Sequence, residues 1–282
     1  MYASTQKMAI SDDRISVINM FVNIAAALLS VPPNALQPFG PPMVEPPPQS
    51  LIESERRKVA TRLLEIGFHS DDSLSSSSNS GVFTLPEAED STLFAQYSSG
   101  SDFGPNPSTY GEVTTLGARQ LFYYMGMSRG DSDKVIFYDL GMGRGKLVVQ
   151  ALLETNPQRS VGIELSMVRY QAAQSAWDTI LQHEEGRAAQ IMADRLLFIR
   201  DDLFQQNLDN ATHIYIASLC FTDDMMQALA DKLAQLDNLR CVASLLEIPG
   251  WPVSRTEFVE MTWTRPNGCQ VYFYDFRYRK DQ

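Results

Sequence analysis

Apolar positions alternate between short strand-like runs and longer amphipathic runs from residue 134 onward. The short runs, rich in β-branched and aromatic residues, predict strands at 134–139, 160–165, 196–200, 213–218, 241–248, 258–264 and 269–278. Amphipathic runs at 145–154, 166–183 and 222–236 predict helices between them. Helices between successive early strands imply right-handed crossovers, and therefore a parallel sheet.

The last two predicted strands have a different connection. They are joined by Arg265-Pro266-Asn267-Gly268, and Asn-Gly is a strong signal for a tight hairpin. The sequence therefore predicts an α/β fold with a seven-stranded, mostly parallel, Rossmann-like sheet that ends in an antiparallel hairpin.

The N-terminal third has another pattern. Residues 32–48 hold 8 of the 15 prolines, and residues 70–80 are rich in serine, so both segments are expected to be linkers. Between them, Ser50 with Glu53 forms a capping box that opens a helix running to Gly67.

An amphipathic helix is also predicted at Ile15–Leu29, with its asparagines along one stripe. We predict an N-terminal helical region with Pro-rich and Ser-rich linkers at 1–108 and a catalytic domain at 109–282. The N-terminal region either packs beside the sheet or forms a lid over its ligand.

The most informative segment for chemistry is Lys134–Lys146, KVIFYDLGMGRGK, in which Gly141, Gly143 and Gly145 alternate. A P-loop needs four residues between its glycines followed by Lys-Ser/Thr, and here Leu147 follows the lysine. The dinucleotide fingerprint G-x-G-x-x-G would need glycine at position 146. The G-x-G-x-G spacing is instead typical of class I methyltransferases, which bind S-adenosylmethionine.

Three acids at strand ends complete a predicted cofactor pocket. Asp139 ends the first strand, where it can pair with the cofactor's ammonium group or hold the loop by accepting backbone N–H bonds. Glu164 lies 21 residues after Gly143, at the end of the second strand, where a ribose diol is bound. Asp202 follows the third strand and is predicted to accept from the adenine amino group, while Asp201 is a solvated or N-cap residue.

Composition narrows the function classes. The net charge is −11, and neither the first 109 residues nor the remainder is basic, so direct binding of nucleic acid through a broad basic surface is not expected. The three cysteines and three histidines are too scattered for a metal site, and reduced core thiols in an intracellular protein are expected. No membrane-spanning run stands out, and Asp12 with Asp13 argues against a secretory leader.

A segment upstream of the sheet points to a family. Thr109–Val113 reads TYGEV, which resembles the T-Y-G-E signature of the disruptor-of-telomeric-silencing family of histone-lysine methyltransferases. That family carries a D-L-G-S-G-x-G loop; here Met142 replaces the usual serine, and Lys146 stands where the family tends to have glutamine. The resemblance implies that S-adenosylmethionine is bound by Tyr110, Gly111, Glu112 and Val113 at its methionine end, by the loop residues Asp139, Gly141, Gly143, Gly145 and Lys146, by Glu164 at the ribose, and by Asp202 with Leu203 at the adenine.

A second match lies at the C-terminal hairpin. Trp263-Thr264 followed by Val271–Tyr274 is similar to the family's W-T hairpin with paired aromatics, which walls the channel for the target lysine. The resemblance places Trp263 and Tyr272 at that channel, with Tyr274 as the alternative to Tyr272.

The chain departs from the family after the fourth strand. Family members have paired asparagines followed by F-A-F, and one asparagine lies near the transferring methyl group; this chain reads Ala217-Ser218-Leu219-Cys220-Phe221. Ser218 falls at the important position and is the predicted catalytic residue there. A serine hydroxyl is shorter than an amide and cannot reproduce all its hydrogen bonds.

The resemblance implies a histone-lysine N-methyltransferase in the nucleus, with a core histone or nucleosome as protein partner and no membrane partner. Without the family context the expected location is the cytoplasm, and secretion is not expected. The acidic composition leaves two alternatives open: a methyltransferase of a non-histone protein, and a catalytically weak regulator that binds S-adenosylmethionine.

Overall fold

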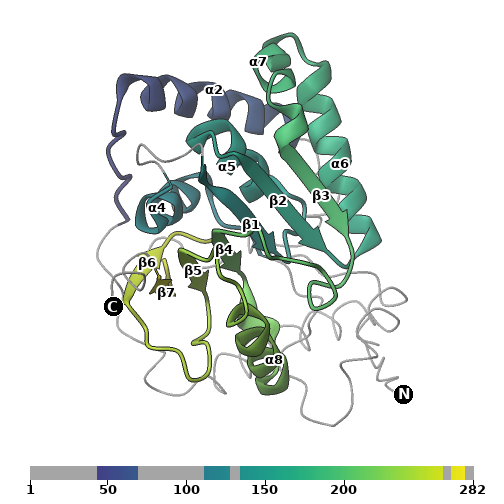
Figure 1. Ribbon diagram of the computed structural model, residues 1–282. Coiled ribbons are helices and arrows are strands. Elements are labelled where there is room, and N and C mark those ends of the chain that lie inside the picture. The colour runs from purple at the N-terminus through teal and green to yellow at the C-terminus, as the bar shows by residue number, and fades with distance from the viewer. Residues whose placement is uncertain (1–42, 69–110, 128–133, 263–267, 277–282) are drawn as a thin grey trace, which may run out of the picture.

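The computed structural model describes residues 43–68, 111–127, 134–262 and 268–276, which form one twisted sheet covered by helices (Figure 1). Seven strands of these residues lie in the order β3-β2-β1-β4-β5-β7-β6. Their bounds are β1 Ile136–Leu140, β2 Arg159–Glu164, β3 Leu196–Arg200, β4 His213–Ile216, β5 Cys241–Ser244, β6 Arg255–Val259 and β7 Cys269–Asp275.

Strand directions confirm the predicted fold class. The pairs among β1 to β5 are parallel, whereas β7 runs antiparallel to both of its neighbours, β5 and β6. The order reverses between β1 and β4, and in sheets of this kind ligands bind outside the carboxyl ends of the strands at such a reversal. A ligand site is therefore expected at the loops that follow β1 and β4.

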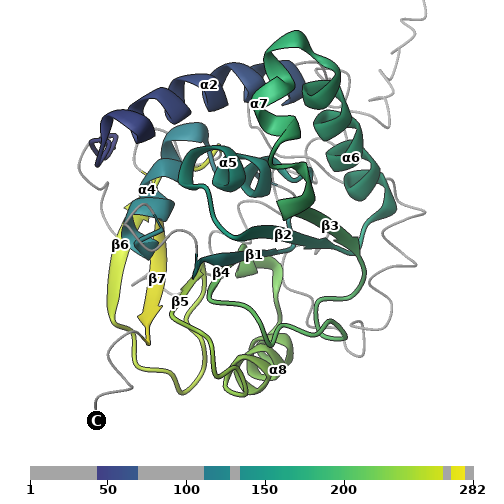
Figure 2. The ribbon, with the colours of Figure 1, turned by 45° about the horizontal axis from the view of Figure 1, so that its top comes forward.

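Helices cover both faces of the sheet, giving three layers (Figure 2). The predicted crossover helices are confirmed as α5 Lys146–Thr155, α6 Met167–Gln182 and α8 Asp223–Leu233. In Figure 2, α5 and α6 lie above the sheet and α8 lies below it. Helix α8 buries one apolar stripe, which includes Met226 and Leu229, against the lower face.

Helix α2, Leu51–Phe68, adds a further layer above α5 and α6 (Figure 2). It begins as predicted, because Ser50 Oγ accepts the N–H of Glu53 at 3.1 Å. Its buried Leu63 and Leu64 join the apolar cluster that α5 and α6 form on that side. The close approach of α2 to α6 requires glycine at position 67, because an added Cβ would lie 2.7 Å from Ile180 Cδ1.

Helix α4, which spans Thr115–Met125, was not predicted from the sequence. Thr114 caps its start by accepting the N–H of Gly117 at 3.0 Å, and Gly126 ends it with φ of 75°. Arg119 on this helix bonds Glu154 on α5 and Thr61 on α2, so one buried side chain ties three helices together.

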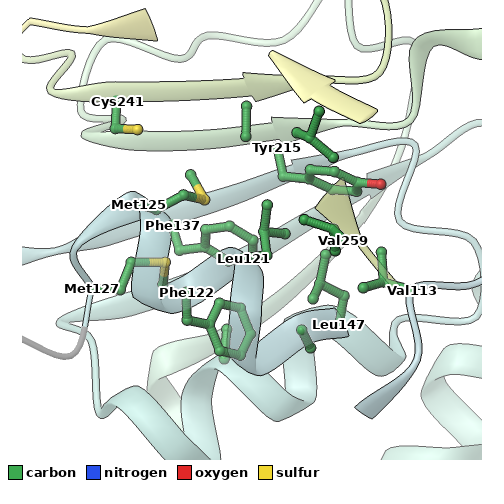
Figure 3. Packing of buried hydrophobic residues seen from close by; sticks show 14 of the residues in the cluster. Val113, Leu121, Phe122, Met125, Met127, Phe137, Leu147, Tyr215, Cys241 and Val259 are labelled. Atoms are coloured by element: carbon green, nitrogen blue, oxygen red, sulfur yellow. The ribbon is translucent and has the colours of Figure 1, made fainter. Parts of the chain in front are cut away.

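An apolar core fills the space between α4 and the sheet (Figure 3). Phe122 of α4 meets Phe137 of β1 edge to face, with ring centroids 6.1 Å apart. Leu121 and Met125 bury the same face of the helix, and Tyr215 of β4 lies in this cluster. The core thus fixes α4, and the chain that enters it, over β1 and β4.

Two strand boundaries differ from prediction for a physical reason. Strand β5 stops at Ser244 instead of 248, because the N–H of Leu246 turns to Ser218 Oγ at 2.9 Å. Strand β6 covers 255–259 instead of 258–264, because Met261 leaves β7 and forms a bridge with Val113.

Other expectations fall on parts of the chain that the structure leaves undescribed. The helix predicted at Ile15–Leu29 and the serine-rich segment at 70–80 lie outside the described residues. The division into 1–108 and 109–282 stays a prediction, although α2 packs directly on α5 and α6.

Candidate functional site

The glycine loop between β1 and α5 turns sharply at each of its three glycines. Gly141, Gly143 and Gly145 have φ of 87°, 55° and 77°, a region that other residues rarely adopt. The loop is anchored to β2, since the N–H groups of Gly141 and Met142 both lie 2.9 Å from the carbonyl oxygen of Ile163. The alternating glycines therefore serve a backbone that has to bend three times in five residues.

Two of these glycines have different surroundings: one packs against other parts of the protein, and the other faces open space. A Cβ added at Gly145 would lie 3.0 Å from Ala173 Cβ and from Phe198 Cε1, so this glycine allows α5 to pack on α6 and β3. A Cβ added at Gly141 would meet nothing within 4 Å. The backbone at Gly141 thus borders open space, where a ligand can approach it closely.

Glu164, at the end of β2, holds the loop in place. Its carboxylate accepts the N–H of Gly143 at 2.9 Å through one oxygen and the N–H of Ser166 at 2.9 Å through the other. Ser166 is the N-cap of α6, so a single buried acid joins the glycine loop to the next helix. Each carboxylate oxygen keeps a second lone pair, which leaves capacity for the predicted ribose contact.

Asp139, at the end of β1, has a different environment. Its side chain is buried, and its Oδ1 has no hydrogen-bond partner among the described residues. Burial, followed by repulsion from Glu164, raises the pKa of Asp139 to about 8. The loop-holding role considered for Asp139 is carried by Glu164, which leaves Asp139 as a buried acid facing no protein donor through Oδ1.

Asp202 and Leu203 follow β3 at the same edge of the sheet. Asp202 is half-buried, and its Oδ1 accepts the N–H of Phe204 at 2.9 Å within the turn. Asp201 is exposed and its Oδ1 accepts the N–H of Asp202 at 2.7 Å, which fits the local role expected of it. The adenine contact of Asp202 and Leu203 stays a prediction.

The upstream signature lies against the end of β6. Glu112 donates its N–H to Thr262 Oγ1 at 3.1 Å, and Thr262 donates its N–H to the carbonyl of Glu112 at 2.9 Å. Val113 forms the adjoining antiparallel bridge with Met261. Glu112 of the upstream signature and Thr262, the residue before Trp263, are thus hydrogen-bonded neighbours although 150 residues separate them.

Lys146, the first residue of α5, extends this junction toward the glycine loop. Its Nζ lies 3.7 Å from Glu112 Oε2, and both side chains are largely buried. Gly111 is half-buried at the start of the segment, and Tyr110 lies outside the described residues. The structure therefore brings Glu112, Val113 and Lys146 together, as a group of predicted cofactor-binding residues would require.

The aromatic residues of the C-terminal hairpin have distinct positions. Trp263 lies outside the described residues. Tyr272 on β7 is half-buried, and it pairs with Ser244 of β5 and with Thr256 of β6. Tyr274 is buried, and its hydroxyl oxygen accepts the N–H of Ile248 at 2.7 Å. Both tyrosines were considered for a channel wall. The hydroxyl of Tyr274 is used in a hydrogen bond within the protein, whereas Tyr272 keeps exposed surface.

Ser218 begins a short turn after β4, and its side chain is fully buried. Its hydroxyl lies 2.9 Å from Ser244 Oγ and accepts the N–H of Leu246 at 2.9 Å. Both partners belong to β5 or to the chain just after it, so the hydroxyl joins the carboxyl ends of two central strands. Its direct contact with a transferring methyl group stays a prediction, and the observed contacts hold the ends of β4 and β5 together.

Tyr215 is a polar residue that the sequence reading did not single out. It lies on β4 directly opposite Asp139, it is buried, and its hydroxyl oxygen has no hydrogen-bond partner among the described residues. A tyrosine inside the buried run His213–Ile216 was the available signal, since a buried tyrosine hydroxyl usually finds a partner.

Within the described ranges, no group of histidine, cysteine and acidic residues is arranged to hold a metal ion. No helix in this part of the chain has both the length and the apolar character needed to cross a bilayer.

A family model described as "Histone methylation protein DOT1" matches residues 86–249, which is more than half of the chain. The match contains the glycine loop, Glu164 and Asp202, and it ends before β6 and β7. No curated protein matches the chain.

Solved structures give weaker likenesses. An RNA methyltransferase from Salinibacter ruber in complex with S-adenosyl-L-homocysteine is 23% identical, with a TM-score of 0.40 over 56% of this chain and 92% of that one. The magnesium protoporphyrin IX methyltransferase of Synechocystis PCC 6803, with the same product bound, is 12% identical, with a TM-score of 0.39 over 58% and 88%. Scores of this size support no argument about activity. The family match is the stronger finding. It shows that the chain belongs to the DOT1 histone methylation family, and the glycine loop predicts that family's cofactor, S-adenosylmethionine.

Proposed function

We propose that this protein is a protein-lysine N-methyltransferase that uses S-adenosylmethionine and acts on a core histone in the nucleus. Family membership supports the methyltransferase class. The observation that supports the finer proposal most is the junction of Glu112 with Thr262, which joins the upstream signature to the chain just after β6, beside Lys146.

The residues present fit the cofactor. Gly141 borders open space, and Asp139 Oδ1 is a buried acceptor with no donor among the residues that the structure describes, as a site for an ammonium group requires. Glu164 would bind the ribose, Asp202 the adenine, and Glu112 with Val113 would line the methionine end. When bound, the cofactor supplies a methyl group on a positively charged sulfur, which is transferred in line to an amine.

The protein's part in this transfer is mainly alignment and desolvation. A lysine side chain with a pKa of about 10.4 costs roughly 4–5 kcal/mol to present as a neutral amine at pH 7. Apolar and aromatic walls such as Tyr272, with Trp263 by resemblance, lower that pKa by desolvating the ammonium form. They would also stabilise the cationic product against their ring faces.

A dedicated general base is not part of the proposal. Of the histidines that the structure describes, His183 caps the end of α6, and His213 is buried at the start of β4, bonded to Thr212. Both positions are away from the carboxyl ends of β1 and β4. The proton is therefore lost to solvent as the amine enters the channel.

Charge favours a basic substrate protein. The chain carries a net charge of −11, which complements a basic histone and disfavours binding to the phosphates of nucleosomal DNA. The same charge supports a basic non-histone protein as an alternative target. The burial of Ser218, in place of the family's asparagine, supports a second alternative, a weakly catalytic regulator that binds the cofactor.

The test is transfer of label from S-adenosylmethionine carrying a tritiated methyl group. Nucleosomes, free core histones and a total cell lysate are incubated separately with the protein, and lysine methylation is verified by amino-acid analysis. We expect label on histone lysine. Label confined to another protein in the lysate contradicts the histone substrate, and binding of S-adenosylhomocysteine without any transfer contradicts the enzyme and supports the regulator.

A further inference from the structure

Two buried polar atoms at the centre of the sheet have no hydrogen-bond partner among the described residues: Asp139 Oδ1 on β1 and Tyr215 Oη on β4. The two residues are directly paired in the parallel register of adjacent strands. Paired residues on parallel neighbours point to the same face of a sheet, so both side chains lie on the side that α4 and α5 cover. Both also lie at the strand reversal where ligands bind in this fold.

An unsatisfied buried group is unusual, because most buried polar atoms in folded proteins are hydrogen-bonded. One such atom can be a local imperfection of packing. Two from adjacent strands, beside a glycine loop that borders open space at Gly141, instead indicate groups that await a ligand.

The orientation of Tyr215 agrees with this interpretation. In Figure 3 its hydroxyl oxygen points away from Cys241, the first residue of β5, and toward the side on which Val113 and Val259 lie. The hydroxyl is therefore directed to the carboxyl ends of the strands. Val113 belongs to the segment that carries the upstream signature, and Asp139 immediately precedes the glycine loop.

The two groups also act on each other electrostatically. Burial raises the pKa of Tyr215 well above its ordinary value, and the carboxyl group of Asp139 raises it further. They do not bond each other, because both atoms remain without a partner. The pair is thus coupled electrostatically, while Asp139 Oδ1 and Tyr215 Oη keep their hydrogen-bonding capacity for a ligand.

We propose that Tyr215 is a cofactor-positioning residue, whose hydroxyl binds the amino-acid end of S-adenosylmethionine together with Asp139. This inference rests on the proposed function. An α-amino acid matches both groups: its ammonium donates to Asp139 Oδ1 and to the tyrosine oxygen, and its carboxylate accepts the tyrosine O–H. The hydroxyl then fixes the direction in which the sulfur and its methyl group face.

The experiment compares two ligands by titration calorimetry: S-adenosylhomocysteine and methylthioadenosine, which lacks the amino-acid portion. We expect Tyr215→Phe to weaken the affinity for S-adenosylhomocysteine about tenfold, as loss of a hydrogen bond to a charged group does. The affinity for methylthioadenosine should change by less than about twofold. Tyr138→Phe is the matched control, since Tyr138 directly precedes Asp139, is also buried, and bonds Asn210 instead. It should leave both affinities unchanged.

A melting temperature of the ligand-free variant adds an independent readout. Removing a hydroxyl that has no partner should leave Tyr215→Phe at least as stable as the parent protein. An equal loss of affinity for both ligands, no loss for either, or a lower melting temperature without ligand would each overturn the inference. If the parent protein binds neither ligand, the proposed function fails instead, and the two failures are thus distinguishable.

Discussion

Lys146 Nζ lies 3.7 Å from Glu112 Oε2, so the first residue of α5 is paired with the segment that carries the upstream signature. A lysine at a helix N-terminus is unfavourable next to the positive end of the helix dipole, and the carboxylate of Glu112 offsets it. The pair connects the glycine loop, which precedes α5, to the segment expected at the methionine end of the cofactor.

Breaking this pair should weaken cofactor binding modestly. We expect Lys146→Gln and Glu112→Gln each to weaken the affinity for S-adenosylhomocysteine about two- to fivefold. The double variant should lose little more affinity, because the partly buried pair couples by about 0.5–1 kcal/mol. Calorimetric titration of the four proteins gives the coupling energy. Lys58→Gln, which removes the exposed pair with Glu55 on α2, should have no effect. Strictly additive losses would show that the two residues act independently.

Met142 and Gly162 form a second chain-specific relationship. A Cβ at Gly162 would lie 2.3 Å from Met142 Sδ and 2.8 Å from Val148 Cγ2, so the glycine on β2 makes room for the methionine that replaces the family's serine. We expect Gly162→Ala to lower the free energy of unfolding by about 1–3 kcal/mol through overpacking.

The rescue variant makes this prediction specific. Met142→Ser combined with Gly162→Ala should recover part of the lost stability, measured by urea unfolding. Serine removes the sulfur 2.3 Å from the new methyl group, whereas the Cβ at position 142 and Val148 Cγ2, both 2.8 Å away, remain. A Gly162→Ala protein as stable as the parent, or a double variant less stable than both single variants, would show that the two positions are not packed together.

Asp139 should make stability depend on pH. Its pKa is about 8 in the folded protein against 3.8 for the free side chain, so the contribution of the protonated group is complete below about pH 4 and is lost as pH rises through 8. Between pH 6 and 8 the ligand-free protein should lose about 1–3 kcal/mol of unfolding free energy more than Asp139→Asn.

Urea unfolding of both proteins at pH 6, 7 and 8 checks this prediction. Asn has nearly the same shape and does not titrate, which makes Asp139→Asn its own packing control. Parallel pH profiles for the two proteins would mean that Asp139 does not bind the proton assigned to it.

The local signals in the sequence were sufficient for the β1–loop–α5–β2 unit. Its strand, glycines and helix are contiguous, and their spacing alone separated this loop from those that bind phosphate. Helix α4 lies between two capping residues, Thr114 and Gly126, although the apolar pattern did not predict it. Those capping residues were readable signals.

Long-range contacts were beyond the reach of pattern analysis. The strand lengths of β5 and β6 depend on Ser218 accepting from Leu246 and on Met261 pairing with Val113, and nothing local announces either contact. The same is true of the site. Sequence position suggested Asp139 and Glu164, but only the hydrogen bonds show that Glu164 is the acid that holds the loop.

The central claim is that the glycine loop holds S-adenosylmethionine, and two glycines allow a matched test. Gly141 and Gly250 have φ of 87° and 74°, and a Cβ at either would meet nothing within 4 Å. Alanine at either position therefore imposes similar backbone strain, of about 1–2 kcal/mol, without a clash in the protein. Only the added methyl group at Gly141 would enter the proposed cofactor space.

The most direct measurement is the affinity of the three proteins for S-adenosylhomocysteine by titration calorimetry. We predict one site per chain in the parent protein, an affinity at least tenfold weaker in Gly141→Ala, and an unchanged affinity in Gly250→Ala. No binding to the parent protein, or equal affinities in the two alanine variants, would contradict the assignment of this loop to the cofactor.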